Sequence, residues 1–347
     1  MIKMIVNAIH NRILIIVMSL ALLATLGASE APQTLTFSHK TYLPLAVNSN
    51  AFFYATSRYM STTSPTALQN LGCAQGKATP SGGTALVILD FGQPAYLAQT
   101  GAYGTWIFGT YAFRSINDIT VASEAFLNSF YLCSPAGAYL RLVVGTVNYY
   151  GSDVVNVTNG HGAAWAGMIN NIAAWIVAPP SIASKVTVRG GNDLEPSFGA
   201  PTVSRAWVDG YTSVFNGTSY LYNYGSCDGC PFSTCTGCTP NNGWTLDDVW
   251  YVSWGAPPAW PVPEIYLTNG VHANQWYRMS LYGYIQHGQA FDFKGSLTQW
   301  QACQSNGPCP YLDNTPSAGW TQLYSAVNSD SRTRQNVGLA SDISWGN

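Results

Sequence analysis

The feature that most constrains the fold is an alternation of short apolar runs with longer segments of helical periodicity. The runs at residues 84–92, 139–147 and 185–191 are typical of strands covered on both faces. The segment 161–177 places its large apolar residues on one helical face and stops before Pro179. Further helices are predicted at 119–131, 202–215, 273–280 and 317–327, and further strands at 220–224, 249–255, 264–266 and 343–345.

Strands that alternate with helices predict a parallel sheet with crossover helices. Residues 84–347 are long enough for a (β/α) barrel, which needs about 250 residues. A doubly wound open sheet is the alternative. No Gly-x-Gly-x-x-Gly follows a predicted strand, so the sequence does not support a dinucleotide site. We therefore expect an α/β fold, a TIM-like (β/α) barrel with disulfide-bearing loops.

The first 31 residues have the three parts of a secretory signal peptide. Lys3 and Arg12 lie in a positively charged start, residues 13–29 are uncharged, and small residues follow up to Ala31. A membrane anchor is the alternative, but the apolar run is shorter than the ~20 residues that a spanning helix needs. We expect a signal peptide at 1–31, an extended arm or spacer at 32–83 and the barrel at 84–347. The mature protein would then be secreted, with no membrane attachment.

The composition narrows the classes of partner. Charged residues make up 9% of the chain, aromatic residues 13%, and the formal net charge is −2. A disordered chain would carry more charge and fewer aromatics, and a nucleic-acid binder would be basic. This composition suits an extracellular surface that meets neutral polar ligands such as sugars, so we expect a polysaccharide or peptidoglycan partner and no nucleic acid.

Eight cysteines fit an exported protein. Four of them, from Cys227 to Cys238, form a CxxC-x4-CxxC pattern that resembles half a zinc ribbon. A zinc ribbon normally has a longer loop between its CxxC pairs, so two local disulfides are the favoured interpretation. We expect Cys303 and Cys309 to close a small loop, which leaves Cys73 and Cys133 to pair. No metal or cofactor is predicted.

Polar residues follow several predicted strands, at the end where barrel active sites gather. Asp193 and Glu195 follow an apolar strand two residues apart, so they would project from the same face. Neighbouring carboxylates raise one another's pKa, and glycoside hydrolysis uses one protonated and one ionised carboxyl group. The alternative is a helix cap or a loop ion pair. Asp90 is a third candidate, or else a buried carboxylate that binds loop amides.

These strand ends resemble those of glycoside hydrolase family 25 lysozymes, in which an Asp-x-Glu after a central strand carries the acid chemistry. The resemblance implies that Glu195 is the general acid, that Asp193 assists through its charge, and that Asp90 belongs to the pocket. It also implies that Trp254 and Tyr224 are platforms for sugar rings. Asn148 and Asn223, at two other strand ends, are expected to contact the substrate.

The sequence therefore predicts a secreted glycoside-hydrolase-like protein that acts on cell-wall or environmental polysaccharide. The alternative is an extracellular protein on the same barrel that binds glycan, or has a structural role, without catalysis. The two differ at Asp193 and Glu195, because the enzyme alone needs one of these carboxyl groups to titrate abnormally.

Overall fold

The main sheet has eight strands, each parallel to its neighbours, in the order β10-β11-β1-β2-β6-β7-β8-β9. The computed structural model describes residues 52–151, 157–307 and 309–345. The strands are β1 (Ala55–Tyr59), β2 (Thr84–Asp90), β6 (Tyr139–Val147), β7 (Val186–Asp193), β8 (Leu221–Asn223), β9 (Ala259–Pro261), β10 (Gly295–Thr298) and β11 (Leu339–Trp345).

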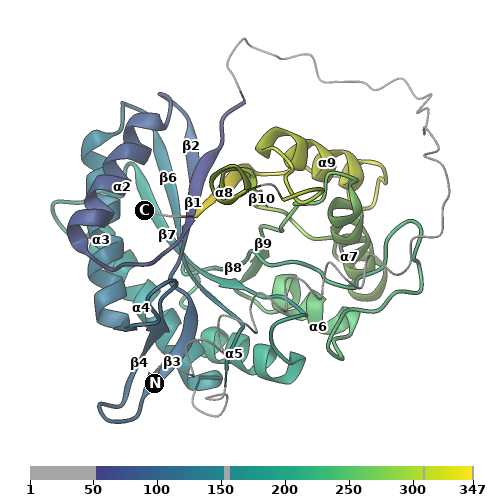
Figure 1. The fold of residues 1–347 in the computed structure, drawn as a ribbon, viewed down its shortest axis with the longest axis horizontal. Coiled ribbons are helices and arrows are strands. Elements are labelled where there is room, and N and C mark those ends of the chain that lie inside the picture. The colour runs from purple at the N-terminus through teal and green to yellow at the C-terminus, as the bar shows by residue number, and fades with distance from the viewer. Residues whose placement is uncertain (1–51, 152–156, 308, 346–347) are drawn as a thin grey trace. The chain divides into compact units, whose positions relative to one another are not determined.

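Backbone hydrogen bonds between the two edges of this sheet close it into a barrel. The N–H of Ile265 donates to Leu297 at 2.8 Å, and the N–H of Leu297 donates to Pro263 at 2.9 Å. Helices surround the strands (Figure 1). They are α2 (Pro65–Ala78), α3 (Ile116–Cys133), α4 (Asn159–Val177), α5 (Pro201–Val214), α6 (Leu246–Trp250), α7 (Val271–His287), α8 (Trp300–Asn306) and α9 (Pro316–Asn328). The fold is a TIM-like α/β barrel, as the sequence predicted.

Two apolar cores hold the barrel together. The larger one lies between strands and helices and includes Val87, Leu142 and Trp165. The smaller one, from the opposite faces of the strands, includes Ile88 and Val143 and fills the barrel. Both faces of the central strands are therefore buried, which explains why these strands have continuous apolar sequences.

The prediction that residues 32–83 form an arm outside the barrel is wrong for its described part. β1 pairs with both β2 and β11, and α2 packs on α3, to which the Cys73–Cys133 disulfide ties it. β1 escaped detection because its inward Ser57 is polar. The Ser57 hydroxyl oxygen accepts a hydrogen bond from the N–H of Ile88 at 2.8 Å. The predicted signal peptide lies outside the described residues.

The predicted strand at 249–255 is also wrong. Residues Leu246–Trp250 form α6, which continues as a π-helical turn, η1 (Tyr251–Gly255). The helix starts at a capping box. The Thr245 side chain accepts a hydrogen bond from the Asp248 N–H, and the Asp248 side chain accepts one from the Thr245 N–H. The strand of this region, β9, follows at Ala259–Pro261.

One insertion was not predicted. A three-stranded antiparallel sheet, formed by β3 (Gln93–Leu97), β4 (Ala102–Trp106) and β5 (Phe113–Ser115), lies between β2 and α3 in the chain. Gly104 is required in this sheet, because a Cβ there would lie 2.0 Å from the carbonyl oxygen of Arg114.

All eight cysteines form disulfides, in the pairs Cys73–Cys133, Cys227–Cys230, Cys235–Cys238 and Cys303–Cys309. The two CxxC motifs thus form local disulfides, as predicted. None of the helices in the described ranges is long and apolar enough to cross a bilayer.

Candidate active site: a carboxylate cluster at the barrel mouth

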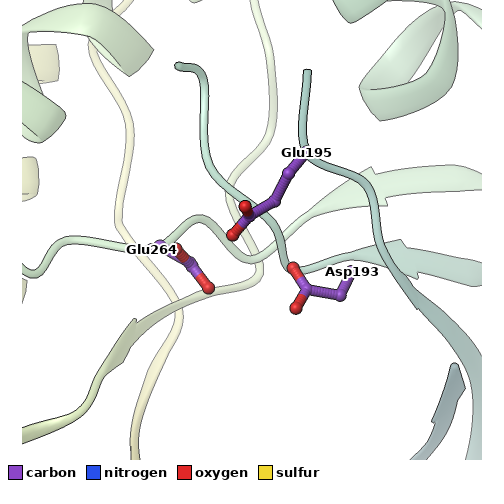
Figure 2. A group of neighbouring side chains, drawn as sticks. All are labelled: Asp193, Glu195 and Glu264. Carbon is purple, nitrogen blue, oxygen red and sulfur yellow. The ribbon is translucent and has the colours of Figure 1, made fainter. Parts of the chain in front are cut away.

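Three carboxylates meet where strands β7 and β9 end. Asp193 is the last residue of β7, Glu195 follows two residues later, and Glu264 comes shortly after β9. One oxygen from each lies within 4.8 Å of the other two. Figure 2 shows the three side chains pointing toward one another. They occupy the C-terminal ends of barrel strands, the face where enzymes with this fold place their catalytic residues.

Glu195 is held in place through its backbone by Asn148. The Asn148 Oδ1 accepts a hydrogen bond from the Glu195 N–H at 3.1 Å, and its Nδ2 donates to the Glu195 carbonyl at 2.9 Å. The same Nδ2 also donates to Ser204 Oγ at 3.1 Å. Asn148 is fully buried. The prediction that it contacts substrate is therefore wrong, because its amide is engaged in fixing the loop.

Asn223 fixes the other side of this loop. Its Oδ1 accepts hydrogen bonds from the N–H groups of Leu194 at 3.4 Å and Gly225 at 3.0 Å. Its Nδ2 donates to Ser253 Oγ at 2.8 Å. Asn223 is also buried, so it positions the loop. The prediction that it contacts the substrate is wrong.

Glu264 is the residue of the cluster that sequence reasoning missed. Its backbone N–H donates to the Gly225 carbonyl at 3.3 Å, and its Oε1 accepts the Tyr266 hydroxyl at 2.6 Å. It was overlooked because strands were assigned to 249–255 and 264–266, which made Trp254 a strand end and Glu264 a strand start. The structure has neither of these strands, and β9 ends at Pro261. An acidic residue shortly after the true strand was the signal that could have identified it.

The pKa values of these carboxyl groups are raised. Burial raises the pKa of Asp193 well above its usual value, and the charge of Glu264 adds to the effect. Burial likewise raises the pKa of Glu195, with added repulsion from Glu264 and Asp193. Burial raises the pKa of Glu264 to about 8, although hydrogen bonds from Tyr266 and Glu195 oppose this shift. The contact between the two side chains raises the pKa of Glu195 and lowers that of Glu264, so Glu195 keeps its proton to the higher pH of the two.

A fourth carboxylate, Asp228, adds negative charge at the site. It lies in the loop closed by the Cys227–Cys230 disulfide and raises the pKa values of Glu195 and Glu264. In the described part of the chain, no lysine, arginine or histidine forms an ion pair with Asp193, Glu195 or Glu264. The site is therefore strongly acidic.

Asp90 lies deeper in the barrel and is only 1% exposed. Its Oδ1 accepts the Gly92 N–H at 2.8 Å and its Oδ2 accepts the Tyr224 hydroxyl at 2.8 Å. Burial raises the pKa of Asp90 to about 7. With both oxygens engaged, Asp90 matches the alternative interpretation, a buried carboxylate that binds a loop amide.

The two predicted sugar platforms differ in exposure. Tyr224 is 1% exposed and occupies space left by Gly145, where a Cβ would lie 2.1 Å from the Tyr224 hydroxyl oxygen. Trp254 belongs to η1, is half-buried and packs against Phe291, with ring centroids 6.3 Å apart. The prediction that Tyr224 stacks on a sugar ring is wrong, and the same role for Trp254 stays a prediction.

Oxygens this close together can also surround a divalent cation, since Ca²⁺ and Mg²⁺ prefer oxygen ligands. Asp193, Glu195 and Glu264 are the candidates for such binding among the described residues.

Comparisons with known proteins do not assign the chain to a family. No protein-family model matches it. No curated protein matches it either. The apo crystal structure of the homocysteine methyltransferase MmuM from Escherichia coli is similar, with a TM-score of 0.38 and 11% sequence identity over 86% of this chain and 94% of that one. The resemblance to family 25 lysozymes stays a hypothesis from sequence.

Proposed function

We propose that the protein is a secreted glycoside hydrolase that acts on cell-wall or environmental polysaccharide. The observation that carries the proposal is the position of Glu195, half-buried beside Glu264 and Asp193 at the strand ends of a barrel. Glycoside hydrolysis needs one carboxylic acid that protonates the leaving oxygen and one carboxylate that attacks the sugar or activates water. The cluster supplies both groups when Glu195 holds its proton and Glu264, whose pKa is about 8, has lost its own.

Glu195 is the proposed general acid. Its pKa is raised well above the usual value by burial and by its acidic neighbours, so it keeps its proton to a higher pH than an exposed glutamate does. Its backbone is fixed on both sides by the Asn148 amide, so its carboxyl group extends from a rigid anchor. Its partial exposure leaves it accessible to a glycosidic oxygen.

Glu264 is the proposed second carboxylate. Burial places the pKa of Glu264 at about 8 even though hydrogen bonds from the Tyr266 hydroxyl and from Glu195 favour its ionised form, so Glu264 becomes an ionised carboxylate as the pH approaches 8. One of its oxygens lies within 4.8 Å of an oxygen of Glu195. This upper limit is below the separation of about 6.5–9.5 Å between the two carboxyl groups of inverting enzymes, which leaves room for a water molecule. We therefore expect Glu264 to act as a nucleophile and the product to retain its anomeric configuration.

The alternative from sequence was glycan binding without cleavage. It depended on Trp254 and Tyr224 as exposed platforms; Tyr224 is buried, and Trp254 is half-buried against Phe291. Secretion has separate support, since disulfides such as Cys73–Cys133 form in oxidising compartments.

The test is hydrolysis of peptidoglycan and of plant, fungal and bacterial polysaccharides by the wild type and three variants. We expect Glu195→Gln to reduce kcat by about 10²–10⁴-fold, because an amide cannot supply the proton. Glu264→Gln should remove the nucleophile and reduce turnover at least as strongly. Glu124→Gln, the same change on helix α3, is the matched control and should retain full activity.

The anomeric outcome follows from NMR spectra of the first product. Full activity of Glu195→Gln, or no turnover of any glycan by the wild type, would contradict the proposed function. An inverted product would contradict the role of Glu264 as a nucleophile and leave the role of Glu195 standing.

A further inference from the structure

Asp193 brings a buried oxygen into the cluster that has no hydrogen-bond partner. The residue is 2% exposed, and no described group bonds its Oδ1. Buried polar atoms in folded proteins are nearly always paired with a protein group or with water. Glu195 and Glu264 already supply the two carboxyl groups that hydrolysis needs. The Asp193 side chain points toward the other two carboxylates (Figure 2), and its unpaired oxygen is therefore available to a ligand.

The electrostatics of the site restrict the chemistry of this ligand. Asp193, Glu195 and Glu264 have no ion-pair partner in the described ranges, and Asp228 and Asp90 add to the field at Asp193. A phosphate, sulfate or carboxylate group on a ligand would be repelled. With a neutral group, only protons would offset the charge of the cluster, as the raised pKa values of its members indicate, whereas a cationic group can take the place of the proton on Asp193.

The number of oxygens suits an organic cation. A primary ammonium has three N–H donors, which match three acceptors. With charge-assisted hydrogen bonds of about 2.8 Å in tetrahedral directions, these acceptors lie about 4.6 Å apart. The three carboxylate oxygens lie no more than 4.8 Å from one another, which admits this arrangement. A Ca²⁺ or Mg²⁺ ion would complete its coordination with water, so the test includes both ions.

We infer that the site takes a primary ammonium, and that the substrate is a glycan whose sugars carry a free amino group. The inference rests on the proposed hydrolysis, for which it names the class of substrate. In a 2-amino sugar the amino group lies on the carbon next to the anomeric carbon. An ammonium on Asp193 therefore brings the neighbouring glycosidic oxygen toward Glu195, because the two side chains lie together at the end of β7.

The test compares three β-1,4-linked hexasaccharides that differ only at carbon 2, in glucosamine, N-acetylglucosamine and glucose. Binding is measured by calorimetry at low salt with Glu195→Gln, so that the ligand is not consumed. We expect the glucosamine hexamer to bind about tenfold or more tightly than the other two, as a charged hydrogen-bonding group allows.

Two further variants in the same background test the role of Asp193. Asp193→Asn keeps the shape of the side chain but removes its charge, and should abolish the preference for glucosamine over glucose. Asp292→Asn removes an equal charge from a carboxylate whose side chain is 52% exposed, and should leave the preference unchanged. Glu264→Gln should also reduce the preference, and thermal melting checks that each variant is folded.

Equal affinities, tighter binding of the acetylated hexamer, or no binding of any hexamer would overturn the inference. Tight binding of CaCl2 or MgCl2 without glycan, lost in Asp193→Asn, would overturn it in favour of a metal site. Wild-type hydrolysis is scored separately on the same hexamers. Cleavage of the neutral hexamers alone would refute the inference and leave the proposed function intact. Preferential binding of the glucosamine hexamer without any cleavage would refute the proposed function and leave the ammonium site intact.

Discussion

Replacement of Asp90 by asparagine should stabilise the protein at alkaline pH. Asp90 is buried, and its pKa is raised from 3.8 to about 7. Below pH 4 the carboxyl group is protonated in both the folded and the unfolded chain. Between pH 4 and 7 the unfolded chain alone ionises, so the stability of the folded state falls as pH rises. Above pH 7 the loss is complete, at about 4 kcal/mol.

Asparagine should remove this loss because it stays neutral and fits the same hydrogen bonds. Its Oδ1 can accept the Gly92 N–H. The Tyr224 hydroxyl can accept from its Nδ2 while donating to the Thr146 carbonyl, which lies 3.0 Å away. The free energy of unfolding of Asp90→Asn relative to wild type should therefore rise by about 2–4 kcal/mol between pH 4 and pH 8.

The assay is urea unfolding with disulfides intact, at intervals from pH 4 to pH 9. The difference between variant and wild type isolates Asp90, because other titrating groups contribute to both proteins. Asp292→Asn, which alters an exposed carboxylate, should show little change with pH. A difference for Asp90→Asn that is constant with pH, or that favours the wild type increasingly as pH rises, would refute the reasoning.

Three further predictions follow from contacts around the site and between helices. Asn148→Ala should lower the free energy of unfolding by about 2–4 kcal/mol in urea titrations and reduce kcat, because it leaves the buried backbone of Glu195 unpaired. Joint replacement of Cys73 and Cys133 by alanine should lower the free energy of unfolding by about 4 kcal/mol, because this disulfide spans 60 residues. Joint replacement of Cys235 and Cys238 should lower it by about 2 kcal/mol, because this disulfide spans 3 residues. In profiles of kcat/KM against pH, activity should fall at high pH as Glu195 loses its proton, and Asp193→Asn should move this fall to lower pH because the Asp193 charge raises the pKa of Glu195.

The strands that were predicted are those buried on both faces. β2 and β6 have apolar residues at most buried positions, and β7 begins with two buried valines before its Gly-Gly pair. β1, β9 and the four-residue β10 were missed. The inward Ser57 of β1 is satisfied by hydrogen bonds with β2 and β11, which no local pattern reveals. β9 has three residues, too few for any periodicity, and the aromatic sequence just before it is helical.

The site was predicted in part. Asp193 and Glu195 project together, as their spacing of two residues indicated. Glu264 lies 69 positions after Glu195 in the sequence. It reaches the cluster only because the strands assemble into one barrel. Asn148 and Asn223 were identified as strand-end polar residues. Their role depends on the orientation of each side-chain amide. Hydrogen bonds with the backbone of Leu194 and Glu195, in the loop after β7, fix that orientation.

The two asparagine clamps have a consequence for how the site behaves during a reaction. Asn148 and Asn223 hold the backbone at Leu194 and Glu195 with amide groups, and amides keep the same charge at every physiological pH. The carboxyl groups that they position can gain or lose protons without any change in the anchors. A lysine or arginine in either place would bind more tightly when a carboxylate ionised and more loosely when it was protonated. With neutral anchors, the framework of the site is the same before and after a proton moves.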